Sequence, residues 1–125
     1  MRIILDAGAL IAIDRRDRQV GAMLRVAQQE RLAVRSSAGV VAQVWRDGSR
    51  QTNLSRVLSG VDVAALDLPI AKRVGRLLGR VDSSDVIDGH VAQLIEPGDQ
   101  LLTSDPQDMR ELLGDRARSV SVVTV

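Results

Sequence analysis

Three aspartates stand at positions from which they could do metal-dependent chemistry. Asp6 ends the apolar run at residues 3–5, Asp105 follows the apolar run at residues 101–104, and Asp88 begins a segment with helical spacing. The carboxyl ends of parallel strands meet at one edge of a sheet, and open α/β sheets bind ligands there. Converging carboxylates repel one another, and a divalent cation relieves that repulsion. The pattern therefore predicts an acidic site for Mg²⁺ or Mn²⁺.

Two more aspartates lie one helical turn away from members of this set. Asp85 precedes Asp88 by three residues and Asp108 follows Asp105 by three, so each pair shares a helix face. Asp85 could add charge to the site, and Asp108 could bind the metal through a water. The alternative is that Asp85 and Asp105 only cap helices. Asp6 has no capping box, and the small residues 7–9 are expected to leave room for a ligand beside it.

The remaining aspartates are expected to be solvated charges in turns or at helix ends. This group consists of Asp14, Asp17, Asp62, Asp99 and Asp115.

Five short apolar runs bounded by turn residues predict the strands that position the acidic site. They lie at residues 2–5, 32–35, 61–64, 100–103 and 120–125. Helical spacing between them predicts helices around residues 10–13, 20–27, 40–45, 54–58, 70–78, 84–94 and 106–113. We expect Ser36 or Ser37, Asp67, and Ser83 or Ser84 to cap three of them, and Gly79 to end the fifth. Alternating strands and helices predict a three-layer α/β/α fold with a mostly parallel sheet, in one domain over residues 1–125.

Composition narrows the classes of function. The 125 residues contain no cysteine, which excludes disulfides and thiolate chemistry and is typical of a reducing cytoplasm. No apolar run approaches the ~20 residues of a membrane span, so we expect no membrane partner. With 17 basic and 16 acidic residues the chain is not a strongly basic nucleic-acid binder. Trp45 is the only aromatic residue, which excludes the stacking platforms of common single-strand binders.

Four segments together resemble a PIN domain, and most closely the VapC toxins of bacterial toxin-antitoxin pairs. They are residues 3–12 (IILDAGALIA), 41–46 (VAQVWR), 88–92 (DGHVA) and 102–109 (LTSDPQDM), in order along nearly the whole chain. The resemblance implies a PIN-like α/β/α fold and an acidic pocket that binds magnesium or manganese. It also implies a ribonuclease toxin in which a metal-activated water hydrolyses RNA.

The resemblance assigns roles to particular residues. Asp6, Asp88 and Asp105 correspond to the family's catalytic, metal-binding aspartates. Gln43 stands where the family usually has a second acidic residue, a glutamate. Glutamine keeps the shape but loses the negative charge and adds a donor, which weakens cation binding. We expect Asp85 to supply the missing charge.

Other polar residues near these motifs have either a functional or a structural role. Ser104 could position a water beside Asp105, or cap the last helix. Arg15 and Arg46, with their basic neighbours, could guide an RNA backbone or lie in solvated loops. His90, the only histidine, is expected to be a partly buried helix residue rather than a general base.

Two further expectations concern partners and an alternative function. The resemblance implies a cognate antitoxin and a homodimer, for which the apolar residues Ile11, Ile13, Val20 and Met23 are candidate contacts. Burial in the monomer core is the alternative explanation for these residues, and the resemblance favours the interface. The alternative function, supported by Gln43, is a PIN-like domain that has lost catalysis and binds RNA or a protein.

Overall fold

Five parallel strands form the central sheet of the computed structural model, which describes residues 1–125. The strands are β1 (Ile3–Leu5), β2 (Val34–Ser37), β3 (Asp62–Ala64), β4 (Gln100–Thr103) and β5 (Ser121–Thr124), in the order β3-β2-β1-β4-β5. Every neighbouring pair is parallel, and Ile3 of β1 lies opposite Val34 and Gln100. The predicted α/β fold with a parallel sheet is therefore confirmed. No helix is both long enough and apolar enough to span a membrane.

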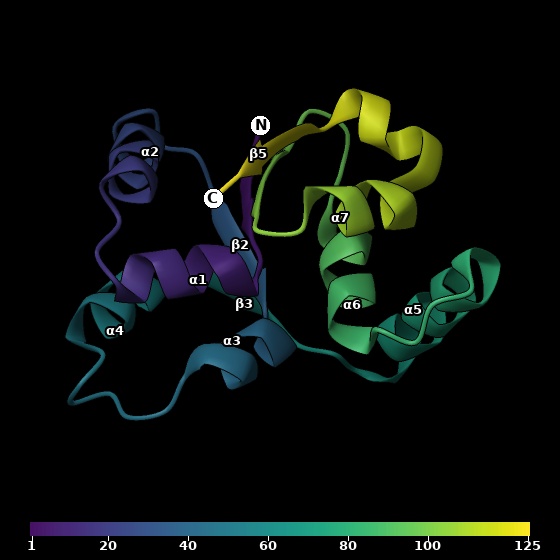
Figure 1. Cartoon of the computed structure of the whole chain (residues 1–125), viewed down its shortest axis with the longest axis horizontal. Helices are drawn as coiled ribbons and strands as arrows, with labels where there is room; N and C mark the ends of the chain where they lie inside the picture. Colours follow the sequence, from purple (N-terminus) through teal and green to yellow (C-terminus); the bar gives the residue numbers. More distant parts are fainter.

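Helices cover both faces of the sheet and complete three layers. In chain order they are α1 (Ala7–Asp14), α2 (Arg18–Gln29), α3 (Ala38–Val44), α4 (Thr52–Leu58), α5 (Leu68–Val81), α6 (Val86–Leu94), α7 (Pro106–Leu113) and the 3₁₀ helix η1 (Gly114–Ser119). In Figure 1, α1, α2 and α4 lie to the left of the strands, and α5, α6 and α7 lie to the right. Because helices lie on both sides, both faces of the central strands are covered.

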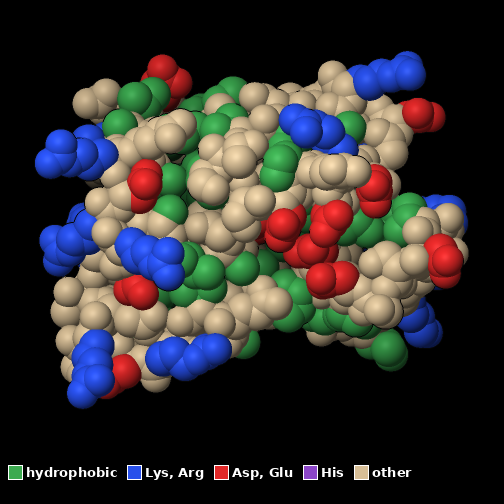
Figure 2. All heavy atoms as spheres, viewed as in Figure 1, with side chains coloured by type: hydrophobic (Ala, Val, Ile, Leu, Met, Phe, Trp, Pro, Cys, Tyr) green, Lys and Arg blue, Asp and Glu red, His purple; other side chains and the backbone are tan.

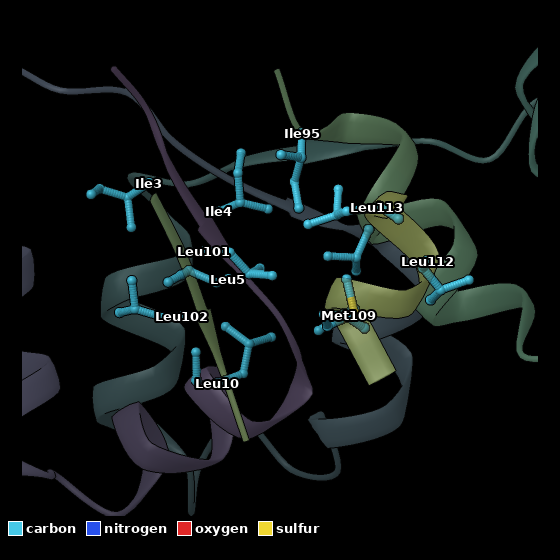
Figure 3. Close-up of a cluster of buried hydrophobic side chains, with 14 of the residues drawn as sticks. Ile3, Ile4, Leu5, Leu10, Ile95, Leu101, Leu102, Met109, Leu112 and Leu113 are labelled. Atoms are coloured by element: carbon cyan, nitrogen blue, oxygen red, sulfur yellow. The ribbon is translucent and has the colours of Figure 1, made fainter. Parts of the chain in front are cut away.

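The core is centred on β1 and β4. Ile4, Leu5, Leu101 and Leu102 have no exposed surface, and α1 and α7 place further apolar side chains against them (Figure 3). A parallel strand that is covered on both faces buries consecutive side chains, which explains why these strands are unbroken apolar runs rather than alternating patterns. The same property made them recognisable in the sequence.

Strand β2 begins two residues later than its apolar run predicts. The prediction was residues 32–35, but Leu32 belongs to the turn after α2, where its amide donates to the Ala27 carbonyl. The strand instead includes Ser36 and Ser37, both completely buried. The Ser36 hydroxyl donates to the Leu5 carbonyl at 2.7 Å, so burial leaves it no unpaired polar group.

Two helix boundaries also differ from the predictions. Helix α5 continues past Gly79 to Val81 and ends at Asp82, whose φ of 55° is left-handed. Helix α6 begins after Asp85, not after Ser83 or Ser84. Gly79 and the serines were plausible signals, but the capping bonds form elsewhere. Ser37 and Asp67 cap α3 and α5 as predicted.

Three residues expected at the surface lie in the interior. Asp99 is 2% exposed and pairs with Arg2, so it is not the solvated turn residue that we predicted. Ile13 and Val20 belong to the core, which favours burial over an interface for both. Of the four predicted contact residues, Ile11 remains exposed and Met23 is half-buried.

Candidate acidic site

Asp6 lies directly after β1 and caps α1. Its carboxylate accepts a hydrogen bond from the Ala9 amide at 3.1 Å, and only 5% of the residue is exposed. The turn is tight because Gly8 packs on Ser104: a Cβ at Gly8 would lie 2.6 Å from the Ser104 Cβ. The space expected beside Asp6 is thus filled by Ser104, and Gly8 brings the first turn of α1 against the loop after β4.

The surroundings of Asp6 stabilise its charge only in part. Burial raises the pKa of Asp6, while the Thr103 side chain and backbone amides, including that of Ala9, lower it. The pKa of Asp6 is raised overall, because the effect of burial exceeds that of these hydrogen bonds. No lysine or arginine forms an ion pair with this carboxylate. Asp6 is therefore a buried carboxylate without a counter-charge within the chain.

Asp88, in the first turn of α6, shows that the acidic residues converge. Its pKa is raised to about 6, first by burial and then by the charge of Asp85. The charges of Asp6 and Asp105, and a hydrogen bond with Asp85, raise it further. Figure 2 shows acidic side chains gathered near the middle of one face, while many Lys and Arg side chains lie toward its margins. Residues from three segments, after β1, after β4 and at the start of α6, thus act on one another.

The two possible capping residues behave differently. Asp85 does cap α6, because its carboxylate accepts from the Asp88 amide at 2.9 Å. Asp105 occupies the capping position of α7 but makes no capping hydrogen bond. Its amide donates to the Thr103 hydroxyl at 2.9 Å, which fixes the backbone while the exposed carboxylate stays free to bind a ligand. Thr103 therefore orders this loop, a role that spacing alone did not identify.

Four other predicted residues are not brought into this group by any contact. Asp108 is exposed on α7 and is not among the charges that act on Asp88. Gln43 is exposed in the last turn of α3 and makes no hydrogen bond. Arg15 is at the opposite end of α1 from Asp6, about 13 Å along the axis at ~1.5 Å per residue. Arg46 donates to the Ala42 and Trp45 carbonyls. Ser104, in contrast, is exposed next to Asp105 in the chain and packs against Gly8.

His90 faces away from bulk solvent and has a structural contact. It is 1% exposed, and its Nδ1 lies 2.7 Å from the Ser37 hydroxyl, which also caps α3. Burial lowers its pKa, and the charge of Arg35 lowers it further. A neutral, buried imidazole that joins α6 to the end of β2 fits the predicted helix residue, although its burial is nearly complete rather than partial.

The donor set has the charge and chemistry that a hard divalent cation requires. The side chains of Asp6, Asp85, Asp88 and Asp105 all offer carboxylate oxygens, and none of them forms an ion pair with a basic residue. No three His, Cys, Asp or Glu side chains are close enough to form a ready-made cage for an ion. Mg²⁺ commonly uses one or two carboxylates and keeps several waters, so an open set of this kind fits it.

Comparisons with known proteins identify the architecture. No protein-family model matches the chain. No curated protein matches it either. Among solved structures, a chain of VapBC2 from Rickettsia felis, crystallised with a DNA fragment from its promoter, superposes with a TM-score of 0.68. The match covers 100% of this chain and 99% of that chain at 14% identity, a level at which the likeness concerns the fold. The fold is PIN-like. The order of strands that gathers Asp6, Asp88 and Asp105 is thus part of a recurring architecture.

Proposed function

We propose that this protein is a metal-dependent endoribonuclease, acting as the toxin of a toxin-antitoxin pair. The observation that carries the proposal is the convergence of four unpaired carboxylates at the carboxyl edge of a PIN-like sheet, with the pKa of Asp88 raised to about 6. Gathering like charges costs stability unless a ligand uses them. A cation that also binds phosphate oxygens is the simplest ligand of that kind.

Each residue has a distinct role in the proposed reaction. Asp6, Asp88 and Asp105 would hold Mg²⁺ or Mn²⁺ directly or through its waters, and the ion would supply positive charge to the scissile phosphate and make a bound water more acidic. The Ala9 amide orients the Asp6 carboxylate, and the bond from the Asp105 amide to Thr103 fixes the backbone of Asp105. Asp85 adds negative charge beside Asp88, as required where Gln43 replaces an acid. Ser104, packed on Gly8, orients the phosphate or a water next to Asp105.

The test is cleavage of a mixed RNA pool by the purified chain with magnesium, with manganese and with EDTA. We expect cleavage with either metal, none with EDTA, and a loss of at least about 100-fold in Asp6→Asn. Urea unfolding of Asp6→Asn shows whether the fold is retained. Cleavage that continues in EDTA, or at the normal rate in a folded Asp6→Asn variant, would contradict the proposal.

We also propose a cognate antitoxin and a homodimer. The similarity to a solved structure supports the cognate antitoxin, since the similar chain belongs to the VapBC2 complex. A groove of about 720 Å³ between α2 and α4 is a suitable surface, with an apolar floor that includes Leu24 and Val57 and with Arg25, Arg31 and Arg56 around it. This composition suits an acidic, amphipathic segment.

Charge reversal tests the antitoxin contact. In Arg25→Glu/Arg56→Glu, we expect RNA cleavage to persist but inhibition by the co-expressed antitoxin to be lost. Retained inhibition would exclude this groove. Sedimentation at high protein concentration tests the homodimer, which a monomer under those conditions would rule out.

The second candidate function is a binding module without catalysis. It is favoured by the exposed, uncharged Gln43 and by the lack of a ready-made cage of three ligands. The two functions differ in their response to metal: a ligand that binds only the native state raises the midpoint of thermal unfolding. A rise with Mg²⁺ or Mn²⁺ that disappears in Asp6→Asn supports the nuclease. No rise with either metal supports the binding module.

A further inference from the structure

The outer face of α5 concentrates positive charge. Lys72, Arg73, Arg76 and Arg80 are all exposed, and none makes an ion pair or a hydrogen bond within the chain. The helix contains no aspartate or glutamate, although the whole chain has almost equal numbers of acidic and basic residues. These four residues, called the α5 basic face, are therefore a local excess of charge rather than a sample of the average surface.

The arrangement follows from the amphipathic character of α5. The buried residues Val74, Leu77 and Leu78 define its inner side. At about 100° per residue, positions 72, 76 and 80 fall on the opposite side, one turn apart. Figure 1 shows α5 at the outer end of its layer, far from α2 and α4, so its outer side is open to a large ligand.

Two glycines lie on the same face without a packing reason. A Cβ at Gly75 or Gly79 would meet no atom within 4 Å, and neither residue has a positive φ. Gly89 of α6 differs, because a Cβ there would lie 2.9 Å from the Leu78 side chain. Glycine is the poorest helix former after proline, so two open glycines weaken α5 without improving its packing. At about 100° per residue they leave bare helix backbone beside the row of basic residues at 72, 76 and 80.

We propose that the α5 basic face binds the sugar–phosphate backbone of single-stranded RNA, which lies against Gly75 and Gly79. The choice of RNA as the polyanion rests on the proposed function. Without a bound metal the acidic site repels phosphates, so basic side chains elsewhere on the chain are needed to hold the RNA. Arginine forks match phosphate geometry, and binding through the backbone requires no aromatic platform, which this chain lacks.

The first experiment measures the salt dependence of RNA binding in EDTA, using fluorescence anisotropy of a labelled 20-nucleotide RNA. Four phosphate contacts predict a slope of log K against log salt of about −2.8 for a single strand. In Arg76→Gln/Arg80→Gln we expect about −1.4, with affinity at low salt reduced roughly tenfold. The matched control is Arg110→Gln/Arg118→Gln, which removes two exposed arginines outside α5 and should keep the slope. Equal losses in both variants would overturn the proposal.

The second experiment tests whether the RNA backbone lies against the two glycines, without changing the charge of the face. Gly75→Gln/Gly79→Gln adds bulk without charge and replaces glycine with a better helix former, so we expect a higher melting temperature but weaker RNA binding. Unchanged binding would exclude a backbone seated on the glycines. Competition by polyglutamate as strong as that by RNA would assign the face to an acidic protein instead.

Failure of this inference can be distinguished from failure of the proposed nuclease. RNA binding that depends on Arg76 and Arg80 without any metal-dependent cleavage would contradict the nuclease and support the α5 basic face. Metal-dependent cleavage with unchanged RNA affinity in Arg76→Gln/Arg80→Gln would do the reverse.

Discussion

Two buried aspartates, at opposite ends of the central strands, have opposite electrostatic environments. Asp99 precedes β4 and is 2% exposed; Asp6 follows β1 and is 5% exposed. Asp99 accepts from the Arg2 guanidinium at 2.7 and 3.2 Å and from the Glu96 amide at 2.8 Å. Burial alone would raise the pKa of Asp99, but the hydrogen bond and charge of Arg2 bring it below its ordinary value. The pKa of Asp6 is raised.

The difference shows how a structural carboxylate can be told from a functional one. Both residues expose almost no surface, so exposed surface alone does not distinguish them. The presence of a counter-charge does: Asp99 is satisfied within the chain, whereas Asp6 faces Asp88 and has no cation. A buried charge without a partner lowers stability, and its place in a cluster marks it as a functional candidate.

The largest expected effect on stability comes from removing the paired charge. Asp99→Asn should lower the free energy of unfolding by about 2–4 kcal/mol, since it breaks a largely buried pair and leaves Arg2 without its partner. Because the folded pKa of Asp99 is depressed, its contribution is present at neutral pH and lost as the pH falls below about 4. Urea unfolding at pH 7 measures the change. Asp6→Asn, the matched control, should cost less than about 1 kcal/mol, and an equal loss in both would erase the contrast.

The next effect tests the packing that holds the acidic edge together. Gly8→Ala should destabilise the chain by about 1–2 kcal/mol, because the new Cβ would overlap Ser104. Thermal or urea unfolding measures it, and Gly8→Ala/Ser104→Gly should recover part of the loss. If Gly8→Ala is as stable as the parent, the close contact between α1 and the loop after β4 is not a constraint.

A smaller change in stability, of opposite sign, is expected at the acidic site, where the carboxylates have no basic partner. In EDTA at pH 7.5, Asp88→Asn should stabilise the chain by about 1–2 kcal/mol, allowing for solvent screening. The folded pKa of Asp88, about 6, is above the ordinary 3.8, so protonation stabilises the native state below about pH 4 and this contribution is lost as the pH rises through 6. The advantage of Asp88→Asn should therefore shrink toward pH 4 and disappear when Mg²⁺ is added. A variant less stable than the parent at pH 7.5 would argue against repulsion at this edge.

The smallest effect concerns the substituted acidic position. Gln43→Glu should tighten metal binding by roughly twofold, or about 0.5 kcal/mol, because the side chain is exposed and its charge is screened. The shift of the unfolding midpoint with Mn²⁺ concentration measures the affinity. Gln28→Glu, beside the groove between α2 and α4, adds the same charge on the other side of the molecule and should change nothing. Equal shifts in both variants would show only an effect of net charge.

The sequence predicted the parallel sheet and the shared edge of Asp6 and Asp105 for a simple reason. Strand and helix alternate along the chain, and that alternation places the residues after β1 and β4 at one edge. The apolar pattern misplaced β2, because the strand includes the polar residues Ser36 and Ser37. Both are buried with their hydroxyl groups hydrogen-bonded. The residues of the α5 basic face, at positions 72, 73, 76 and 80, and the glycines at 75 and 79 also follow a helical spacing in the sequence.

By itself, the sequence determined the layers, the strands that form the core and the edge at which Asp6 and Asp105 emerge, since hydrophobic periodicity is a local property. Only the tertiary structure decided which buried aspartate has a partner. Arg2 and Asp99 are 97 residues apart, and their pairing exists because β1 and β4 are neighbours in the sheet. The same holds for the repulsion at Asp88, whose neighbours come from three segments. Electrostatic interactions act through space and change with burial, so a list of charges along the chain does not contain them.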